Sequence, residues 1–280
     1  MAAGTSTRFV PLSAETPKGL LNVNGEVLIE RQIRQLKEAG ITDITVVVGY
    51  KAELFRFLKE KYDVSLVHND DYCRYNNTAS LMCVLDKLGD TYICSSDNYF
   101  PDNVFIEHPE DSYYSALYAE GPTREYCMST DADNCIKSVT VGGRDSWYMV
   151  GHVYFSRDFS QMFREILSRD YEREETRLGY WEDVYIRHIH ELPRMRMRRY
   201  REHDIEEFDT LDELRLFDTS YIKDTRSSVI KHLANTLRCN EEDLYGFANI
   251  PHHGDSLLFR FVKGDDAYEY DAAADEIRKI

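Results

Sequence analysis

Residues 26–49, EVLIERQIRQLKEAGITDITVVVG, place a helix directly before a buried strand, and this pair decides the fold class. The apolar residues of the first half recur at helical spacing, and Gly40 follows where a left-handed C-cap is wanted. They are Leu28, Ile29, Ile33, Leu36 and Ala39. We therefore expect an amphipathic helix over residues 26–39. Residues 44–48 form a continuous β-branched run, which is typical of a strand covered by helices on both faces. A helix followed by such a strand predicts a parallel α/β sheet.

The alternation of helix and strand continues beyond this pair. The expected elements are helices over residues 52–60 and 80–88 and strands over residues 64–67 and 91–95. Together they give at least three units of one doubly wound, mostly parallel, Rossmann-like sheet. After Asp97 the pattern changes to mixed strands and two more helices, which we expect to form one wall of a cleft. These are strands over residues 112–119, 136–141 and 148–155 and helices over residues 159–168 and 181–190.

Two places in this pattern suit a ligand, because ligands of parallel α/β sheets bind outside the carboxyl ends of the strands. Asp97 directly follows a predicted strand, and residues 4–8, Gly-Thr-Ser-Thr-Arg, form a loop of small residues. The backbone N–H groups of such a loop can approach a triphosphate closely. A short loop of this composition is more often a plain connection. However, Thr16-Pro17-Lys18 sets a rigid turn before a lysine, and this pairing favours a phosphate site.

The composition excludes several other classes of protein. The chain has 34 Lys and Arg against 50 Asp and Glu, a net charge of −16, which argues against a general nucleic-acid binder. No apolar run reaches the roughly 18 to 20 residues that a membrane-spanning helix needs, and no secretory signal is visible. We therefore expect a cytoplasmic protein without membrane insertion. Six cysteines without C-x-x-C spacing predict reduced thiols instead of a disulfide or zinc framework.

The last part of the chain has start signals of its own. Five arginines between Arg194 and Arg201 are expected to form a solvated strand face that answers the acidic residues 202–209. After a helix over residues 211–217 we expect a domain boundary near Tyr221. Residues 221–280 then form a small α+β segment, with a helix to about residue 237, an N-cap at Asn240 and a hairpin over residues 257–270.

The loop and its lysine carry a family resemblance. Residues 2–12, AAGTSTRFVPL, together with Pro17-Lys18 resemble the signature of nucleotidyltransferases of the sugar-nucleotide type. Further stretches narrow the resemblance to the choline-phosphate cytidylyltransferase branch, over residues 1 to about 218. They are LIERQI (28–33), VGYK (48–51), YNN (75–77), SDNY (96–99) and YWE (180–182). The resemblance implies that the phosphate of a small acceptor attacks the α-phosphorus of CTP and expels pyrophosphate.

The resemblance also implies the roles of the charged residues. Phosphoryl-type transfer mainly asks for positioning and charge neutralisation, so Arg8 and Lys18 are the predicted catalytic cations, with Lys18 acting at the transition state. Mg²⁺ is the expected cofactor, held by Asp97 and Glu182, with Asp183 as the alternative to Glu182. Outside this family context, Asp97 would fit an Asx turn and Glu182 the first turn of a helix.

The nucleotide and the acceptor are assigned further residues by resemblance. The backbone of residues 2–5, Ala2, Ala3, Gly4 and Thr5, is expected to contact the nucleotide, and Asn77 and Ser80 the cytosine. The alternative is a helix cap made by Asn77, Thr78 or Ser80, and for Ser80 the two roles are equally expected. The quaternary ammonium of phosphocholine needs aromatic faces and a carboxylate. Tyr126, Tyr180 and Trp181 are the candidates for that pocket, which would place the protein in phospholipid or cell-surface choline metabolism. Phosphoethanolamine remains an alternative acceptor.

Three further expectations concern the ends of the chain and the competing functions. Relatives place four or five apolar residues before the segment that begins at Ala2, so we expect an upstream strand to complete the sheet. Residues 229–280 resemble the opening of a choline-kinase-like lobe, either as part of a fused kinase or as an interaction segment, and His252-His253 is expected to be a solvated loop. The competing functions are a sugar-1-phosphate nucleotidyltransferase and a catalytically impaired nucleotide-binding module.

Overall fold

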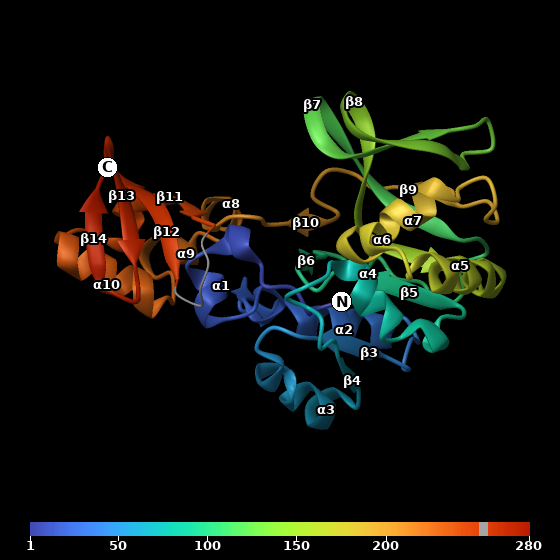
Figure 1. Ribbon diagram of the computed structural model, residues 1–280, viewed down its shortest axis with the longest axis horizontal. Coiled ribbons are helices and arrows are strands. Elements are labelled where there is room, and N and C mark those ends of the chain that lie inside the picture. Colours follow the sequence, from blue (N-terminus) through green and yellow to red (C-terminus); the bar gives the residue numbers. More distant parts are fainter. Residues whose placement is uncertain (252–256) are drawn as a thin grey trace. The chain divides into compact units, whose positions relative to one another are not determined.

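The computed structural model describes residues 1–251 and 257–280 and divides into two compact units (Figure 1). The sheet unit comprises Met1–Gly4 and Ile29–Glu207, and the loop unit comprises Thr5–Leu28 and Phe208–Ile280. The sequence predicts one domain boundary, near Tyr221, with residues 1–220 in one domain and residues 221–280 in the other. The compact units divide the chain elsewhere, because residues 5–28 pack with the C-terminal part. His252 and His253 lie outside the described residues.

The helix and strand that open the pattern form where the sequence predicts them. Helix α2 (Leu28–Glu38) ends at Gly40, whose φ of 86° is the left-handed conformation that favours glycine. Strand β3 (Thr45–Val48) then pairs in parallel with β4 (Ser65–His68), and a short 3-10 turn and α3 (Phe57–Tyr62) lie between the two strands. The predicted parallel α/β unit is confirmed, and the fold is of the Rossmann-like α/β class.

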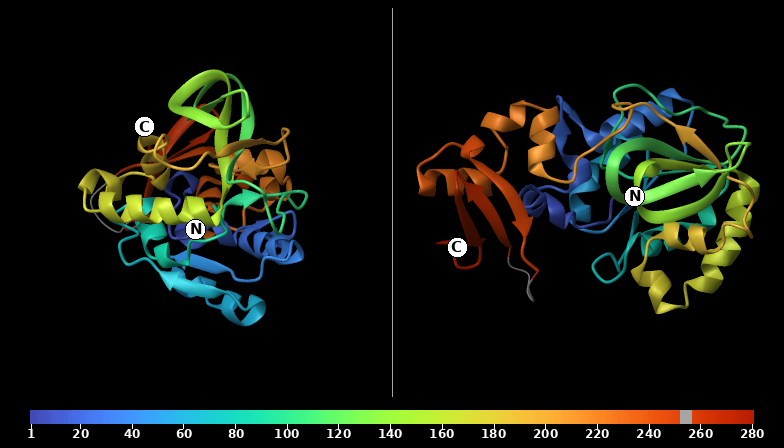
Figure 2. Two further views of the ribbon diagram at one scale, coloured as in Figure 1. Left: turned by 90° about the vertical axis from the view of Figure 1, so that its right-hand side faces the viewer. Right: turned by 90° about the horizontal axis from the view of Figure 1, so that it is seen from above.

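The second sheet of the unit is mixed. Its order is β5-β8-β7-β9, with β5 (Thr91–Cys94) and β7 (Tyr113–Thr130) antiparallel to β8 (Ile136–Phe155), and with β9 (Arg196–Arg199) parallel to β7. The strand predicted over residues 91–95 was expected to extend the parallel sheet. Instead, β5 pairs with β8, and the two strands are antiparallel. The separate strands expected over residues 112–155 merge into one long, irregular hairpin (Figure 1, Figure 2).

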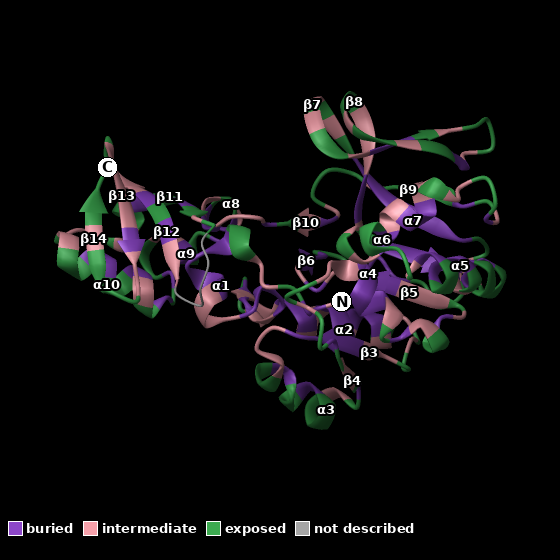
Figure 3. Ribbon diagram, in the orientation of Figure 1, coloured by how far each residue is buried: buried purple, intermediate pink, exposed green. Residues whose placement is uncertain are grey.

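Helices close the core of the sheet unit. Helices α4 (Asn77–Met82), α5 (Arg157–Asp170), α6 (Glu174–Leu178) and α7 (Trp181–Arg187) bound this part of the unit, and buried residues gather on β3, α4 and α7 (Figure 3). Helix α5 covers the helix predicted over residues 159–168, and its Phe159, Phe163 and Leu167 are fully buried. A short 3-10 turn, η4 (Leu85–Lys87), follows α4 in place of the single helix expected over residues 80–88.

The basic stretch does form a strand, but most of its ion pairs are not those expected. Arg194 pairs with Asp131 and Asp133, and Arg196 pairs with Asp111. Arg201 alone, among the described ion pairs of this stretch, pairs with the acidic run, through Asp204. The other partners lie just before β7 and in the turn just after it. Both places are beside the start of β9, because Arg196 pairs with Tyr113 and bridges Cys135.

The loop unit combines short N-terminal elements with the C-terminal α+β part. Its N-terminal elements are η1 (Thr7–Phe9), α1 (Leu12–Glu15), η2 (Lys18–Leu20), β1 (Asn22–Val23) and β2 (Glu26–Val27). Its C-terminal elements are α8 (Leu211–Phe217), α9 (Ser220–Lys223), α10 (Ser228–Leu237), η5 (Glu241–Asp243) and a sheet of β11 (Leu244–Asn249), β12 (Leu258–Lys263), β13 (Asp266–Asp271) and β14 (Glu276–Lys279).

Several predictions for this C-terminal part are confirmed. Helix α8 and the β12–β13 hairpin form as expected. The amide of Asn240 donates to Asp243 at 2.8 Å where the next turn begins. The helix expected to run to residue 237 is interrupted, because Ser227 starts a new helix by accepting a hydrogen bond from the amide of Ile230.

None of the described helices is long and apolar enough to cross a membrane. The six cysteines are free thiols.

Candidate active site

The two predicted catalytic cations meet at one carboxylate of the loop unit. Asp209 lies 2.5 Å from Arg8 Nη1 through Oδ2 and 3.4 Å from Lys18 Nζ through Oδ1. Lys18 is only 5% exposed and also lies over the ring of Phe9, with Nζ 5.9 Å from the ring centre. Arg8 is largely exposed, so its pair with Asp209 is weak and easily exchanged for another anion. Among the described ion pairs, the two cations therefore share the carboxylate of Asp209.

Local sequence explains how these side chains are placed. Ser6 adopts a left-handed conformation with φ 52°, which turns the chain into the 3-10 turn that carries Arg8. Lys18 begins a second 3-10 turn directly after Pro17, whose fixed φ suits the start of a helical turn. Both cations therefore stand on short, rigid turns.

Asp209 is not among the site residues that the sequence predicts. It belongs to the acidic residues 202–209, which are expected to pair with the arginines. A usable signal was present, because Thr210 and Glu213 have the spacing of a capping box. Thr210 Oγ1 accepts from the amide of Glu213, and Glu213 Oε2 accepts from the amides of Thr210 and Asp209. An aspartate next to a helix cap is held in a fixed place and can serve as a counter-ion.

The predicted nucleotide-binding residues of the sheet unit gather at the carboxyl end of β3. The amide of Ala2 donates to the carbonyl of Val47 at 2.8 Å, and Ala2 forms a parallel bridge with Val48. Gly49 permits this close approach, because a Cβ there would lie 2.9 Å from the carbonyl oxygen of Ala3 and 2.6 Å from Tyr72 Cβ. The first residues thus lie at the sheet edge where ligands of this fold class bind.

The side chain of Ser80 belongs to the same edge. Its hydroxyl accepts a hydrogen bond from Asn69 Nδ2 at 3.0 Å, and the amide of Asn69 donates to the carbonyl of Val48. Ser80 is therefore not a helix cap. The cap of α4 is Asn76, whose Oδ1 accepts from the amide of Asn77.

Asn77 joins α4 to the start of α7. Its Oδ1 accepts from the amide of Trp181 at 2.9 Å, and its Nδ2 donates to Glu182 Oε2 at 3.1 Å. The hydroxyl of Tyr114 donates to the other oxygen, Glu182 Oε1, at 3.1 Å. Both carboxylate oxygens of Glu182 thus have protein donors.

The Glu182 carboxyl group has an unusual acidity. Burial raises its pKa to about 7, against the opposing effect of the hydrogen bonds from its own backbone, Asn77 and Tyr114. Its side chain is therefore partly protonated at neutral pH. A carboxyl group that readily keeps its proton and already accepts two side-chain hydrogen bonds is a poor first choice for Mg²⁺, which needs an ionised oxygen ligand.

An aromatic and acidic cluster surrounds the start of α7. Tyr126 donates its hydroxyl to Asp183 Oδ1 at 2.8 Å, and the rings of Tyr126 and Tyr180 meet edge to face with centroids 6.4 Å apart. Asp183 Oδ2 accepts from the amide of Tyr180 at 2.9 Å. Burial, followed by the bond to Asp183, raises the pKa of Tyr126. Because Tyr180 is 46% exposed, this cluster presents aromatic surface beside a carboxylate.

Trp181 lies in the hydrophobic core. It is 1% exposed, stacks on Tyr114 with centroids 5.9 Å apart, and receives edge contacts from Phe155 and Phe163. A residue that binds an ammonium group must offer it a ring face. The role of Trp181 in acceptor binding therefore remains a prediction, and the exposed ring of Tyr180 suits that role better.

Asp97 lies in the turn that follows β5, as predicted. Gln32 holds this turn by donating to the carbonyls of Ser95, at 2.7 Å, and Asn98, at 3.3 Å. The next two residues form β6 (Asn98–Tyr99), which pairs with β10 (Glu206–Glu207) so that Asn98 faces Glu207. The turn therefore brings Glu207, a residue that sequence reasoning did not select, close to Asp97.

The oxygen atoms of this turn and of β10 are of the kind that magnesium binds. Asn98 Nδ2 lies 3.5 Å from Glu207 Oε2, while the buried Asn98 Oδ1 has no hydrogen-bond partner among the described residues. The described residues contain no cluster of three or more His, Cys, Asp or Glu side chains that could hold a metal ion by themselves. Magnesium needs only one or two carboxylates when a nucleotide supplies phosphate oxygens, so a site with Asp97 and Glu207 as its protein ligands would have enough of them.

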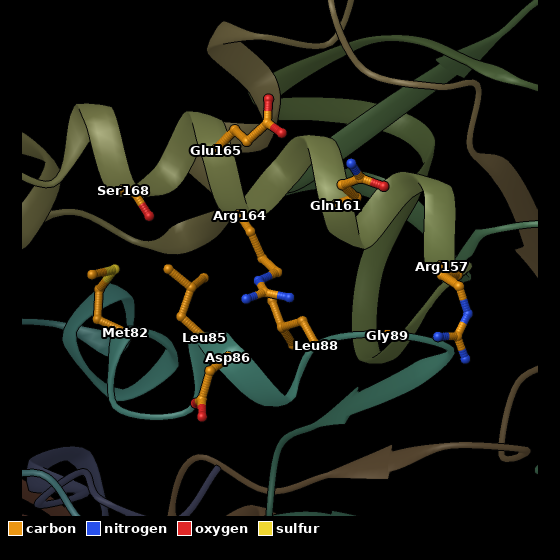
Figure 4. A pocket seen from close by; sticks show the side chains of 10 residues that line it. All are labelled: Met82, Leu85, Asp86, Leu88, Gly89, Arg157, Gln161, Arg164, Glu165 and Ser168. Carbon is orange, nitrogen blue, oxygen red and sulfur yellow. The ribbon is translucent and has the colours of Figure 1, made fainter.

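A separate cavity of about 840 Å³ lies elsewhere in the sheet unit (Figure 4). Met82, Leu85 and Leu88 form one side, and the side chain of Arg164 extends toward them from α5. No predicted site residue lines this cavity. It therefore has no part in the candidate site.

Comparison with known proteins agrees with these observations. A family model for the MobA-like NTP transferase domain matches residues 1–110. The chain is 36% identical over 231 residues to a 2-aminoethylphosphonate cytidylyltransferase of Lancefieldella rimae, covering 81% of this chain and 94% of the relative. It is 36% identical over 192 residues to a choline-phosphate cytidylyltransferase of Streptococcus pneumoniae, covering 69% and 84%.

A solved structure supports the same relationship. The CTP:phosphocholine cytidylyltransferase LicC of Streptococcus pneumoniae superposes with a TM-score of 0.75 and 34% identity, covering 78% of this chain and 96% of that chain. The identity and coverage are high enough to fix the family as well as the fold. The chain therefore belongs to the nucleotidyltransferases with a MobA-like NTP transferase domain, as a cytidylyltransferase related to the choline-phosphate cytidylyltransferases.

Proposed function

We propose that the protein transfers CMP from CTP to phosphocholine, giving CDP-choline and pyrophosphate. One observation carries the choice of acceptor: exposed Tyr180 and the pair of Tyr126 with Asp183 form an aromatic and acidic cluster. A quaternary ammonium group has no proton to donate, so it is bound by aromatic faces and by a nearby negative charge. Glu182, next to this cluster, adds a second carboxyl group.

The chain's own cations supply the charge neutralisation that the transfer needs. A phosphate oxygen of the acceptor forms a bond to the α-phosphorus of CTP while the bond from that phosphorus to the bridging oxygen breaks, and pyrophosphate leaves. The nucleophile is already ionised near neutral pH, so no general base is required. Lys18 and Arg8 are proposed to bind the triphosphate, with Lys18 stabilising the charge that develops in the transition state.

Magnesium is the proposed cofactor. When bound, it would neutralise part of the charge of the triphosphate and polarise its phosphoryl oxygens. Asp97 and Glu207 would hold it. Between the originally expected Glu182 and Glu207, the donor chemistry favours Glu207, because Glu182 keeps a proton to about pH 7 and already has two side-chain donors.

A second acceptor class has its own support. The chain matches the 2-aminoethylphosphonate cytidylyltransferase of Lancefieldella rimae at the same 36% identity and over more of its length. A primary ammonium group can donate three hydrogen bonds, so it would be bound mainly by Asp183 and Glu182 and less by the tyrosine rings.

The test is an assay of pyrophosphate release with CTP and a panel of acceptors. The panel contains phosphocholine, phosphoethanolamine, 2-aminoethylphosphonate and glucose 1-phosphate. Phosphocholine should give the highest kcat/KM, and Tyr180→Ala should lower kcat/KM for phosphocholine more than for 2-aminoethylphosphonate. Preference for the phosphonate would replace the proposed acceptor. Turnover with glucose 1-phosphate alone would indicate a sugar-1-phosphate enzyme, and CTP binding without any turnover would indicate an impaired module.

A further inference from the structure

The segment that carries Lys18 is held on both sides by the C-terminal part of the loop unit. After the lysine, the carbonyl of Asn22 accepts two hydrogen bonds, from the hydroxyl of Tyr221 at 2.7 Å and from Arg226 Nη1 at 2.7 Å. The amide of Asn24 donates to Asp218 Oδ2 at 2.8 Å. These partners are about 200 residues away along the chain, so they connect two distant parts of the sequence.

The segment is also held before the lysine. Glu15 Oε1 accepts from the amide of Ser228 at 2.8 Å and from the hydroxyl of the same serine. Ser228 is the first residue of α10, where a carboxylate is stabilised by the free amides and the dipole of the helix. Contacts to residues 15, 22 and 24 therefore enclose Lys18 from both directions along the chain.

Tyr221 and Arg226 are themselves prearranged for this contact. Tyr221 is 1% exposed, and the guanidinium of Arg226 lies over its ring at 4.2 Å. Arg226 Nη2 also donates to Ser220 Oγ at 2.7 Å. Because the arginine is fixed by both contacts, little side-chain freedom is lost when it binds the carbonyl of Asn22.

The backbone transmits this restraint to the lysine. Lys18 starts a 3-10 turn in which its own carbonyl accepts from the amide of Leu21, one residue before Asn22. The Lys18 side chain is buried, so it cannot correct a shift of the turn by swinging through solvent. A displacement of Asn22 therefore becomes a displacement of Lys18 Nζ.

We propose that Tyr221 and Arg226 are positioning residues of the transfer reaction, which fix the turn that carries Lys18 by holding the carbonyl of Asn22. The inference rests on the proposed role of Lys18 at the transition state. It gives the C-terminal part of this chain a function in catalysis that requires no second activity of its own.

The test uses the full chain with Arg226→Ala, Tyr221→Phe and the double variant. Misplacement of a catalytic group by a fraction of an ångström is costly, so the double variant should lose about tenfold in kcat, while KM for CTP changes less than about twofold. Arg226→Lys, which keeps one donor and the charge, should recover part of the rate. Arg278→Ala is the matched control, because Arg278 is an exposed arginine of the same unit that pairs with Glu276 on its own strand.

Amide hydrogen exchange provides a readout that does not depend on the acceptor. Residues 15–24 should exchange faster in the double variant than in the wild type or in Arg278→Ala. Tyr221→Phe keeps the buried ring, so it separates the loss of one hydrogen bond from a loss of folding. A kcat equal to that of the control, or unchanged exchange in residues 15–24, would overturn the proposal. If the wild type transfers CMP to no acceptor, the proposed function has failed, and the exchange rates alone decide whether these residues hold the turn.

Discussion

At the scale of single residues, Lys18 is the side chain with the strongest case for a role in the chemical step. It is buried, it stands on a short turn, and its ammonium group lies 3.4 Å from Asp209. A cation that is already in place does not need to be reorganised when charge develops on the phosphoryl oxygens. Arg8 is exposed and pairs with the same carboxylate, which suits a residue that exchanges Asp209 for the triphosphate.

The first prediction concerns this difference. Lys18→Ala should lower kcat by about a hundredfold and change KM for CTP much less, because its main contribution is made in the transition state. Steady-state kinetics with saturating acceptor measure both constants. Lys279→Ala removes an exposed lysine of the same unit that pairs with Asp266, and it should behave as the wild type. A large rise in KM at constant kcat would assign Lys18 to ground-state binding of the nucleotide.

The second prediction concerns the acidity of Glu182. With a pKa near 7, its carboxyl group is neutral below that pH and negatively charged above it. A cationic acceptor is bound better by the charged form. KM for phosphocholine should therefore rise as the pH falls from 8 to 6. Glu182→Gln should start at the higher value and keep only the change caused by protonation of the acceptor's own phosphate, whose second pKa is about 6. Equal pH profiles of KM for the two proteins would show that Glu182 does not act on the acceptor.

The sequence alone predicts only some of the candidate site residues. Asp97 and Lys18 follow a strand and a proline, so local pattern predicts where they stand. Asp209 and Glu207 looked like members of a solvated acidic run. Their importance depends on which distant residues lie beside them: Lys18 is 191 positions from Asp209, and Asn98 is 109 positions from Glu207. Spacing along the chain carries no information about such pairs.

At the scale of helices and strands, the spacing of apolar residues predicts most of the elements. It does not predict which strands pair with one another. The helix and buried strand of residues 28–48 formed as predicted, because amphipathic spacing and β-branched runs act over a few residues. The antiparallel pairing of β5 with β8 depends on residues 91–94 meeting residues 152–155, and an apolar strand does not specify the direction of its neighbour. For the same reason, the sequence predicts separate strands over residues 112–155, where the structure has the long β7–β8 hairpin.

The third prediction belongs to strand β8. His152 on this strand is 1% exposed, and burial, followed by the charge of Arg198, lowers its pKa to about 3. The hydroxyls of Tyr113, Tyr200 and Ser115 and the rings of Phe100 and Phe105 surround it. The folded state therefore keeps the imidazole neutral at pH values where the unfolded chain protonates it.

The sign of the effect follows from proton uptake. Below about pH 6.5 the unfolded state binds one proton more than the folded state. The free energy of unfolding should therefore fall by about 1.4 kcal/mol for each unit by which the pH is lowered, from this residue alone. Urea unfolding of the wild type and of His152→Gln between pH 7 and pH 5 measures it. The variant should lack this component, whereas His232→Gln, which alters a half-exposed histidine, should retain it. The same pH slope in the His152 variant would place the proton uptake elsewhere.

At the scale of the whole molecule, an acidic protein must bind an acidic nucleotide. The net charge of −16 opposes the approach of CTP, and this repulsion acts over roughly 8 to 10 Å at ordinary ionic strength. Close to the phosphates, a few cations determine whether CTP binds. The loop unit carries Arg8 and Lys18, and the sheet unit carries the carboxylates proposed for magnesium. No composition-level property predicts this division, because it depends on residues 5–28 folding with residues 208–280.

The last prediction tests whether magnesium supplies the missing positive charge. Removal of Mg²⁺ by EDTA should weaken CTP binding by about tenfold, equivalent to about 1.4 kcal/mol. Asp97→Asn and Glu207→Gln should each bind CTP in the presence of Mg²⁺ about as weakly as the wild type does without it. Isothermal titration calorimetry measures all these affinities in the absence of acceptor. Glu206→Gln is the neighbouring control, since Glu206 pairs with His203. If Glu182→Gln abolished the Mg²⁺ effect and Glu207→Gln did not, the ion would be held at the start of α7. The negative charge of the protein would then be offset beside the acceptor cluster, and not beside the turn that follows β5.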